Sequence, residues 1–364
     1  MSQVPEMKIQ RLEQIDRELA RLVATRISLV GEMSGSGGEA PTSILQEQQR
    51  LERMDFHDGI SSEISSEISS EVRKVLSFVV GATHLYGAKP SRVAYLGPEH
   101  SYSYLAACKF FGGSTHLQGV SSIGAVFEEV ERGQARYGVV PIENSTDGRI
   151  VDTFTTFIER PVQICGEVHL AIHHNLLAKC PRAKVRVVCS KPQALSQCRR
   201  WLAEHLPGVT LKEVSSTTEA ARIAAEEPET AAVASIQAGV EYGLDVLCES
   251  IEDNPHNSTR FAIIGKEQPA PTGNDKTSLL FRVPHRPGAL ADVMMLFKQR
   301  GINLTWIESF PVPRTPNEYF FFVELEGHSQ TEQLAKAIDE LKLTALRFDL
   351  LGSYPKGLAD ALHS

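Results

Sequence analysis

The chain has 364 residues, of which 42% are hydrophobic and 23% charged, and this is the composition of globular protein with room for two or three hydrophobic cores. Its formal net charge of −8 argues against a nucleic acid or an anionic membrane as partner, because their phosphates would be repelled. We therefore expect a multidomain protein whose partner is a small molecule.

The cysteines and the apolar segments indicate where the protein works. None of the six cysteines belongs to a Cys-x-x-Cys pair, and no basic and then apolar segment opens the chain. No apolar run reaches the roughly 18 residues that span a bilayer. We expect a cytoplasmic protein with reduced thiols and no membrane partner.

Residues 1–88 have the pattern of a helical domain. Apolar residues at the spacing of one helix face predict a long helix over residues 5–33. A short helix is expected near residues 44–54 and a longer one over residues 60–79, where Ile-Ser-Ser-Glu occurs three times in succession. Three such helices enclose a small core, so we expect this domain to pair with a second copy of itself.

Residues 91–268 alternate short β-branched strands with helices, which is typical of an α/β domain. A long alternating segment, residues 164–177, begins a second block, so we expect two lobes that face a cleft. Helices are expected near residues 103–111 and 123–131, and strands at residues 93–96, 137–141, 164–177, 185–189, 210–214 and 231–234.

The last part of the chain, residues 275–355, follows a proline-containing linker and has its own pattern. The order strand, helix, strand, strand, helix, strand predicts a ferredoxin-like module that folds independently. The elements are expected at residues 278–283, 289–299, 303–308, 319–325, 331–341 and 346–351.

Three polar clusters follow predicted strands and precede helices: Ser101-Tyr102-Ser103, Asn144-Ser145-Thr146 and Ser216-Thr217-Thr218. Helix N-termini at the carboxyl ends of strands attract anions, so together the clusters describe a carboxylate-binding cleft. The alternative is that each cluster is a helix cap. Gly148 would let the backbone turn tightly beside a ligand.

A fourth polar run, Asn257-Ser258-Thr259-Arg260-Phe261, opens an apolar strand. A hydroxyl, a cation and an aromatic ring in succession suit the binding and protonation of a small carboxylate. The alternative is an arginine in a surface ion pair.

These motifs resemble, in order and spacing, the signatures of prephenate dehydratases. The resemblance rests on Tyr95-Leu96-Gly97-Pro98 with Ser101-Tyr102-Ser103, Val140-Pro141-Ile142-Glu143-Asn144-Ser145 with Gly148, Ser216-Thr217 with Glu219, and Asn257 with Thr259-Arg260-Phe261. Residues 275–326 resemble the ACT regulatory domain of that family. Residues 5–87 resemble the helical chorismate mutase domain that bifunctional members carry.

The resemblance implies a two-lobed α/β catalytic domain like that of periplasmic binding proteins, and the conversion of prephenate to phenylpyruvate without a cofactor. Thr259 is then the residue that delivers or relays the proton to the departing hydroxyl. Glu143 is a candidate relay for it, and Arg260 a candidate clamp for the pyruvyl carboxylate. The alternative is that Glu143 and Arg260 pair with each other.

The same resemblance implies two sets of binding residues. The substrate set is Ser101, Tyr102, Ser103, Asn144, Ser145, Gly148, Ser216, Thr217, Asn257 and Phe261, although Phe261 also suits the core. The set for phenylalanine, as a regulatory effector, is Gly288, Ala289, Leu290, Asn303, Glu308 and Ser309.

The chain departs from the family pattern in three places. Lys191 stands where the family usually has histidine, in Ser190-Lys191-Pro192-Gln193, and Phe310 stands where the ACT signature has arginine. In the helical domain only Arg26 and Glu47 match the polar residues of a mutase site. We expect little or no mutase activity, so the domain would serve dimerisation; a shifted register that restores the charge is the alternative.

Several interpretations stay open from the sequence. The chain is expected to form a dimer or tetramer. There are three alternatives to a prephenate dehydratase: an arogenate dehydratase, a fully bifunctional enzyme and a noncatalytic sensor of aromatic metabolites. His169, His173 and His174 lie on an alternating strand without a Cys or carboxylate that completes a ligand set, so no metal is expected.

Overall fold

A computed structural model describes residues 3–35, 75–76, 79, 92–112, 116–312, 315 and 317–357. The chain divides into two compact units, the first comprising Met1–Val93 with Ala107–His116 and the second Ala94–Ala106 with Leu117–Ser364. Each unit is described by itself.

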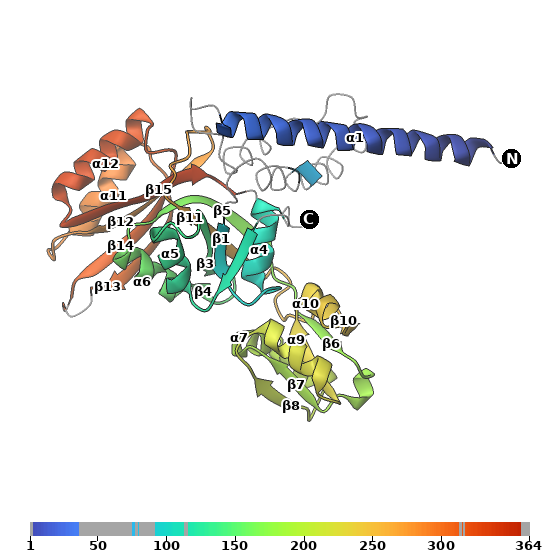
Figure 1. Ribbon diagram of the computed structural model, residues 1–364. Helices are drawn as coiled ribbons and strands as arrows, with labels where there is room; N and C mark the ends of the chain where they lie inside the picture. The colour runs from blue at the N-terminus through green and yellow to red at the C-terminus, as the bar shows by residue number, and fades with distance from the viewer. Residues whose placement is uncertain are drawn as a thin grey trace. The chain divides into compact units, whose positions relative to one another are not determined.

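The described part of the first unit is dominated by one long helix, α1 (Gln3–Gly35), as the periodicity predicts (Figure 1). Its apolar side chains are unusually exposed: Ile15, Leu19, Leu22 and Leu29 are 41%, 55%, 63% and 52% accessible. The other two predicted helices lie almost entirely outside the described residues, and so does Glu47.

The second unit contains the two α/β lobes and the C-terminal module. In the first lobe the strand order is β2-β1-β3-β11-β5, and β4 pairs with β3. The elements of this lobe are β1 (Arg92–Leu96), α4 (Tyr102–Phe111), β2 (His116–Val120), α5 (Ile123–Glu131), β3 (Tyr137–Asn144), β4 (Gly148–Arg149), α6 (Val151–Glu159), β5 (Gln163–Ala171) and β11 (Ser258–Gly265).

The second lobe is an insertion between β5 and β11, with strand order β10-β6-β9-β7-β8. Its elements are β6 (Asn175–Ala178), η1 (Arg182–Lys184), β7 (Val187–Ser190), α7 (Pro192–Gln197), α8 (Arg199–His205), β8 (Thr210–Glu213), α9 (Thr217–Glu226), β9 (Thr230–Ala234), α10 (Ile236–Glu241) and β10 (Asp245–Cys248).

The predicted single strand over residues 164–177 is wrong. The structure divides this segment into β5 in one sheet and β6 in the other, because the chain crosses between the lobes at Ile172–His174. Two backbone hydrogen bonds join the two crossings: Ile172 donates to the carbonyl of Asn257 (2.8 Å), and Ile251 donates to that of His174 (2.7 Å). An unbroken alternation in sequence does not mark where a strand changes sheets.

The C-terminal module has the predicted β-α-β-β-α-β order and an antiparallel sheet ordered β13-β14-β12-β15. Its elements are β12 (Asp275–Arg282), α11 (Ala289–Gln299), β13 (Leu304–Pro311), β14 (Tyr319–Glu326), α12 (Glu332–Thr344) and β15 (Arg347–Pro355). The helices cover one face of this sheet, where Phe281, Val323 and Leu325 belong to their core.

The other face of the module packs on the first lobe (Figure 1). Alternate residues of β14 divide between the faces, so Phe320 and Phe322 join the core of the first lobe while Val323 faces the helices. Strands β15 and β5 approach so closely that a Cβ on Gly352 would lie 2.1 Å from the carbonyl oxygen of Ile164. The module therefore packs directly against the first lobe.

Candidate active site

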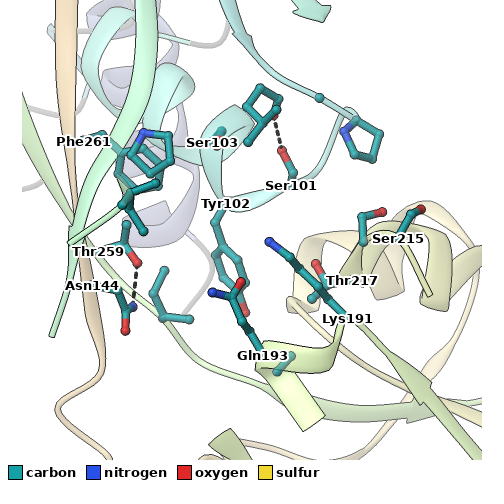
Figure 2. A pocket seen from close by; sticks show the side chains of 18 of the residues that line it. Ser101, Tyr102, Ser103, Asn144, Lys191, Gln193, Ser215, Thr217, Thr259 and Phe261 are labelled. Atoms are coloured by element: carbon teal, nitrogen blue, oxygen red, sulfur yellow. Dashed lines mark hydrogen bonds between the residues drawn. The ribbon is translucent and has the colours of Figure 1, made fainter. Parts of the chain in front are cut away.

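A cavity of about 780 Å³, here called the interlobe cavity, opens between the two lobes (Figure 2). Residues of both lobes and of one crossing segment line it. The polar and charged side chains in its wall are Glu99, Ser101, Tyr102, Ser103, Ser121, Asn144, Asp147, His174, Lys191, Gln193, Gln197, Ser215, Ser216, Thr217 and Thr259.

Two of the predicted polar clusters are helix caps and cavity walls at once. Ser101 directly precedes α4, where its Oγ accepts from the N–H of Tyr104 at 3.3 Å, and Ser216 caps α9 by accepting from the N–H of Glu219 at 3.0 Å. Both helices point their N-termini at the interlobe cavity, which favours an anion there. The capping and binding interpretations are compatible, because the same serine can cap a helix and line the cavity at which that helix begins.

Thr259 lies at the start of β11 opposite Asn144 of β3. The Nδ2 group of Asn144 donates to Thr259 Oγ1 at 2.9 Å. The Oδ1 atom of Asn144 accepts from the backbone N–H groups of Thr146 and Asp147, each at 2.9 Å, and this fixes which end of the amide faces Thr259. Since the Thr259 oxygen accepts this bond, its own hydrogen is available to donate into the cavity.

A chain of polar side chains continues from Asn144 across the cavity wall. Asn144 Nδ2 donates to Asn257 Oδ1 (2.9 Å), and Asn257 Nδ2 donates to Gln197 Oε1 (3.0 Å). The same Gln197 oxygen lies 2.7 Å from His174 Nε2, and His174 Nδ1 lies 3.1 Å from the Tyr102 hydroxyl. This network ties residues of both lobes to the position of Thr259.

Burial determines the charge of the titratable members of this network. Desolvation lowers the pKa of His174, so its imidazole is neutral near pH 7. Desolvation, with the charge of Glu252, raises the pKa of Tyr102, which keeps the phenol protonated. The wall beside Thr259 is therefore polar and largely uncharged.

Sequence reasoning did not find His174, Gln193 or Gln197 as site residues. A signal for the two glutamines was present, because positions four apart on a helix share one face and both follow the Lys191-Pro192 start of α7. For His174 no sequence signal existed, since its place depends on the crossing between lobes.

Arg260 does not line the interlobe cavity, which corrects its predicted role as a carboxylate clamp. Successive side chains of a strand point to opposite faces, so Thr259 and Phe261 face the cavity while Arg260 faces the C-terminal module. Its guanidinium makes a two-pronged pair with Glu324 at 2.6 and 2.9 Å, and lies over the ring of Trp306, 4.6 Å from the centroid.

Glu143 is likewise outside the cavity, on the same face as Arg260. Its Oε2 atom lies 3.7 Å from Arg260 Nε, a looser ion pair than the one that Arg260 makes with Glu324, so the alternative in which these two side chains pair with each other holds only in part. The predicted relay from Glu143 to Thr259 has no support in this geometry, because Glu143 and Asn144 alternate on β3 and Asn144 takes the cavity side.

Three other predicted substrate residues shape the loops rather than the cavity wall. Ser145 donates through Oγ to the carbonyl of His256 (3.2 Å) and accepts from the N–H of Ser258 (2.9 Å). Asn257 positions Asn144, as above. Gly148 has φ of +81°, the conformation that the turn into β4 requires and that favours glycine.

A buried ionic cluster joins the lobe to the C-terminal module. Arg260 and Lys276 face Glu324 and Glu167, and Lys276 Nζ lies 2.9 Å from a Glu167 oxygen. Burial alone would raise the pKa of Glu167, but a hydrogen bond from His169 and the charges of Lys276 and Arg260 lower it to about 2. The Glu167 carboxylate is therefore ionised at neutral pH.

The predicted effector residues do not gather at one described cavity. Gly288 has φ of +80° and directly precedes α11, whose first two residues are Ala289 and Leu290. Ala289 lines a small cavity of about 130 Å³ beside Arg286 and Asp292.

The remaining effector candidates lie on or beside β13. Asn303 donates to Glu326 at 3.1 Å, Glu308 pairs with Arg149 of the first lobe, and Ser309 is exposed. The effector assignment remains a prediction.

Metal-ligating groups, cysteines and long apolar helices are the remaining features of the described part of the chain. No group of three or more metal-ligating side chains occurs among these residues. None of the six cysteines, all of which lie in these ranges, forms a disulfide. No helix in these ranges is both long and apolar enough to cross a membrane.

The sequence matches the family model described as Prephenate dehydratase over residues 93–269 and that of the ACT domain over residues 277–343. A bifunctional chorismate mutase/prephenate dehydratase of Aquifex aeolicus is 38% identical over 368 residues, which cover 98% of this chain and 99% of the relative.

Two solved structures share the fold. The prephenate dehydratase of Arthrobacter aurescens, in complex with L-Phe, has a TM-score of 0.68 at 31% identity and covers 73% of this chain and 90% of that one. A structure described as GqqA, a novel type of quorum quenching acylases, has a TM-score of 0.67 at 30% identity over 73% of this chain and 98% of that one. With a relative aligned along nearly its whole length, the chain belongs to the prephenate dehydratase family, in the form that carries a C-terminal ACT domain.

Proposed function

We propose that the chain is a prephenate dehydratase that makes phenylpyruvate in the interlobe cavity. The ring carboxylate leaves as carbon dioxide, the electron pair of the broken carbon–carbon bond enters the ring, and the ring hydroxyl takes a proton and leaves as water. The ring becomes aromatic, so atoms and charges balance without an oxidant or a reductant. The protein has to hold a dianion and donate one proton.

The observation that carries this proposal is the setting of Thr259. Asn144 occupies a lone pair of the hydroxyl and leaves its hydrogen for the substrate. A threonine hydroxyl is a weak acid, so its proton passes to the leaving oxygen only as negative charge develops on that oxygen, and solvent afterwards returns a proton to Thr259. The preorganised Asn144 amide then stabilises the hydroxyl as the proton moves.

The test supplies purified protein with prephenate, arogenate and chorismate separately and follows phenylpyruvate, phenylalanine and prephenate. We expect phenylpyruvate from prephenate, and a fall in kcat of about 100-fold or more in Thr259→Ala. Thr259→Ser keeps the hydroxyl and is the matched control, with most of the activity retained. No phenylpyruvate from wild type, or near-normal turnover by Thr259→Ala, contradicts the proposal.

For the other domains we propose that phenylalanine binds the ACT domain as an inhibitor and that the chain is a homo-oligomer. The first part is supported by the relative that binds L-Phe and by the glycine turn at Gly288. The second is supported by the exposed apolar residues of α1. The helical domain contributes little or no mutase activity, and chorismate turnover in the test above checks this.

A further inference from the structure

The interlobe cavity has little positive charge for a substrate that carries two carboxylates. Arg260 faces away from it and is neutralised by Glu324. Among the described residues that line the cavity, Lys191 is the single lysine or arginine, whereas Glu99 and Asp147 bring two carboxylates. Among these described residues, Lys191 and uncharged donors are therefore the groups that can bind the dianion.

Lys191 is placed to act in this way. It precedes α7 in the second lobe, and Figure 2 shows its side chain extending into the cavity toward Tyr102, from the side where Thr217 begins α9. Within the described part of the chain no ion pair or hydrogen bond engages its ammonium group. The nearby Asp147 carboxylate accepts instead from Gln197 Nε2 at 2.8 Å.

The reaction itself decides which carboxylate a lysine can usefully bind. The ring carboxylate must lose its charge as it leaves as carbon dioxide, so a cation held against it would stabilise the ground state more than the transition state and slow the step. The pyruvyl carboxylate keeps its charge from substrate to product. A cation there binds substrate, transition state and product alike.

We infer that Lys191 is the binding residue for the side-chain carboxylate, which it holds together with the N-terminal end of α9, and that it leaves the chemical step to Thr259. This inference rests on the proposed function. It assigns a role in this chain to a position where lysine replaces the histidine common in the family.

The experiment compares Lys191→Met with wild type by steady-state kinetics and by binding of two ligands. Phenylpyruvate carries the carboxylate, and phenylacetone has an uncharged methyl group in its place. We expect Lys191→Met to raise KM for prephenate and the dissociation constant of phenylpyruvate about 10-fold or more, with kcat within about threefold of wild type. Phenylacetone should bind both proteins equally, and Lys191→Arg should restore part of the phenylpyruvate affinity.

Lys184→Met is the matched control, because Lys184 is an exposed lysine of the same lobe outside the cavity lining. It should leave every constant unchanged. Equal phenylpyruvate affinity in wild type and Lys191→Met would overturn the inference, and so would a parallel loss of phenylacetone binding. Failure of wild type to convert prephenate would instead overturn the proposed function, which the ligand-binding comparison does not require.

Discussion

Arg260 is a buried cation whose surroundings affect the stability of the fold. It is 8% exposed and its charge is balanced by Glu324, which is fully buried in the C-terminal module. Removing one partner of a buried pair leaves the other charge uncompensated. We expect Glu324→Gln to destabilise the protein by about 3 kcal/mol in denaturant unfolding at pH 7.

Glu326→Gln is the control for that variant, because it removes a carboxylate from the same strand whose partner, Lys356, lies at the surface. A surface pair of this kind contributes about 1 kcal/mol or less. If the two variants unfold at the same denaturant concentration, the buried pair contributes no more to the free energy of unfolding than the surface pair does.

At the scale of single residues, the sequence predicted part of the site correctly and part of it wrongly. Short polar clusters predicted Ser101, Asn144, Ser216 and Thr259 as neighbours, and all four line the interlobe cavity. Arg260 was assigned to the same wall although strand alternation turns it away. Its true partner, Glu324, lies 64 residues further along the chain, and no local pattern connects the two.

At the scale of elements, the periodicity of apolar residues predicts the bounds of a helix or strand correctly where that element belongs to a single lobe or sheet. The helices over residues 123–131 and 289–299 have the bounds that the sequence predicts. The crossing between lobes and the packing of the C-terminal module on the first lobe were not predicted, because both depend on which sheet a strand joins. The one sign of this packing in the sequence is that β14 has apolar residues on both of its faces.

Strand β13 joins the predicted effector residues to the first lobe, so we expect an effector to act on the lobe through it. Phe310 is stacked on Phe154 of the first lobe, with ring centroids 5.1 Å apart, so it faces the lobe while its neighbour Ser309 is exposed. We expect Phe310→Leu to bind phenylalanine within about threefold of wild type but to show weaker maximal inhibition, since affinity and coupling are separate free energies.

Calorimetric titration with phenylalanine and inhibition of prephenate turnover measure these two quantities. Ser309→Ala is the comparison, and it should change affinity if Ser309 contacts the effector. Loss of binding and inhibition together in Phe310→Leu would show that Phe310 belongs to the effector site itself.

At the scale of the whole molecule, the residues expected to serve catalysis and regulation lie in one compact unit, and the helix expected to serve oligomerisation lies in the other. The interlobe cavity and the ACT domain belong to the second unit, whereas α1 belongs to the first. A related fold also occurs in a protein described as an acylase, so the fold alone does not determine the reaction. The reaction follows from the residues of the cavity.

Helix α1 carries Ile15, Leu22 and Leu29 seven residues apart, with Leu19 on the adjoining row. A seam with this repeat is typical of helices that pack lengthwise against another helix, and its exposure leaves apolar area to be covered. Because a second copy presents the same seam, we expect wild type to be a dimer or larger and Leu22→Asp to shift the mass toward the monomer.

Light scattering coupled to size-exclusion chromatography measures that mass across a concentration series. Ala24→Asp adds the same charge on the opposite side of α1, at another exposed position, and should leave the oligomer intact. Since the interlobe cavity lies in the other unit, the Leu22→Asp protein should still convert prephenate. An unchanged mass in Leu22→Asp would mean that the seam is covered from within the chain or that another surface forms the oligomer.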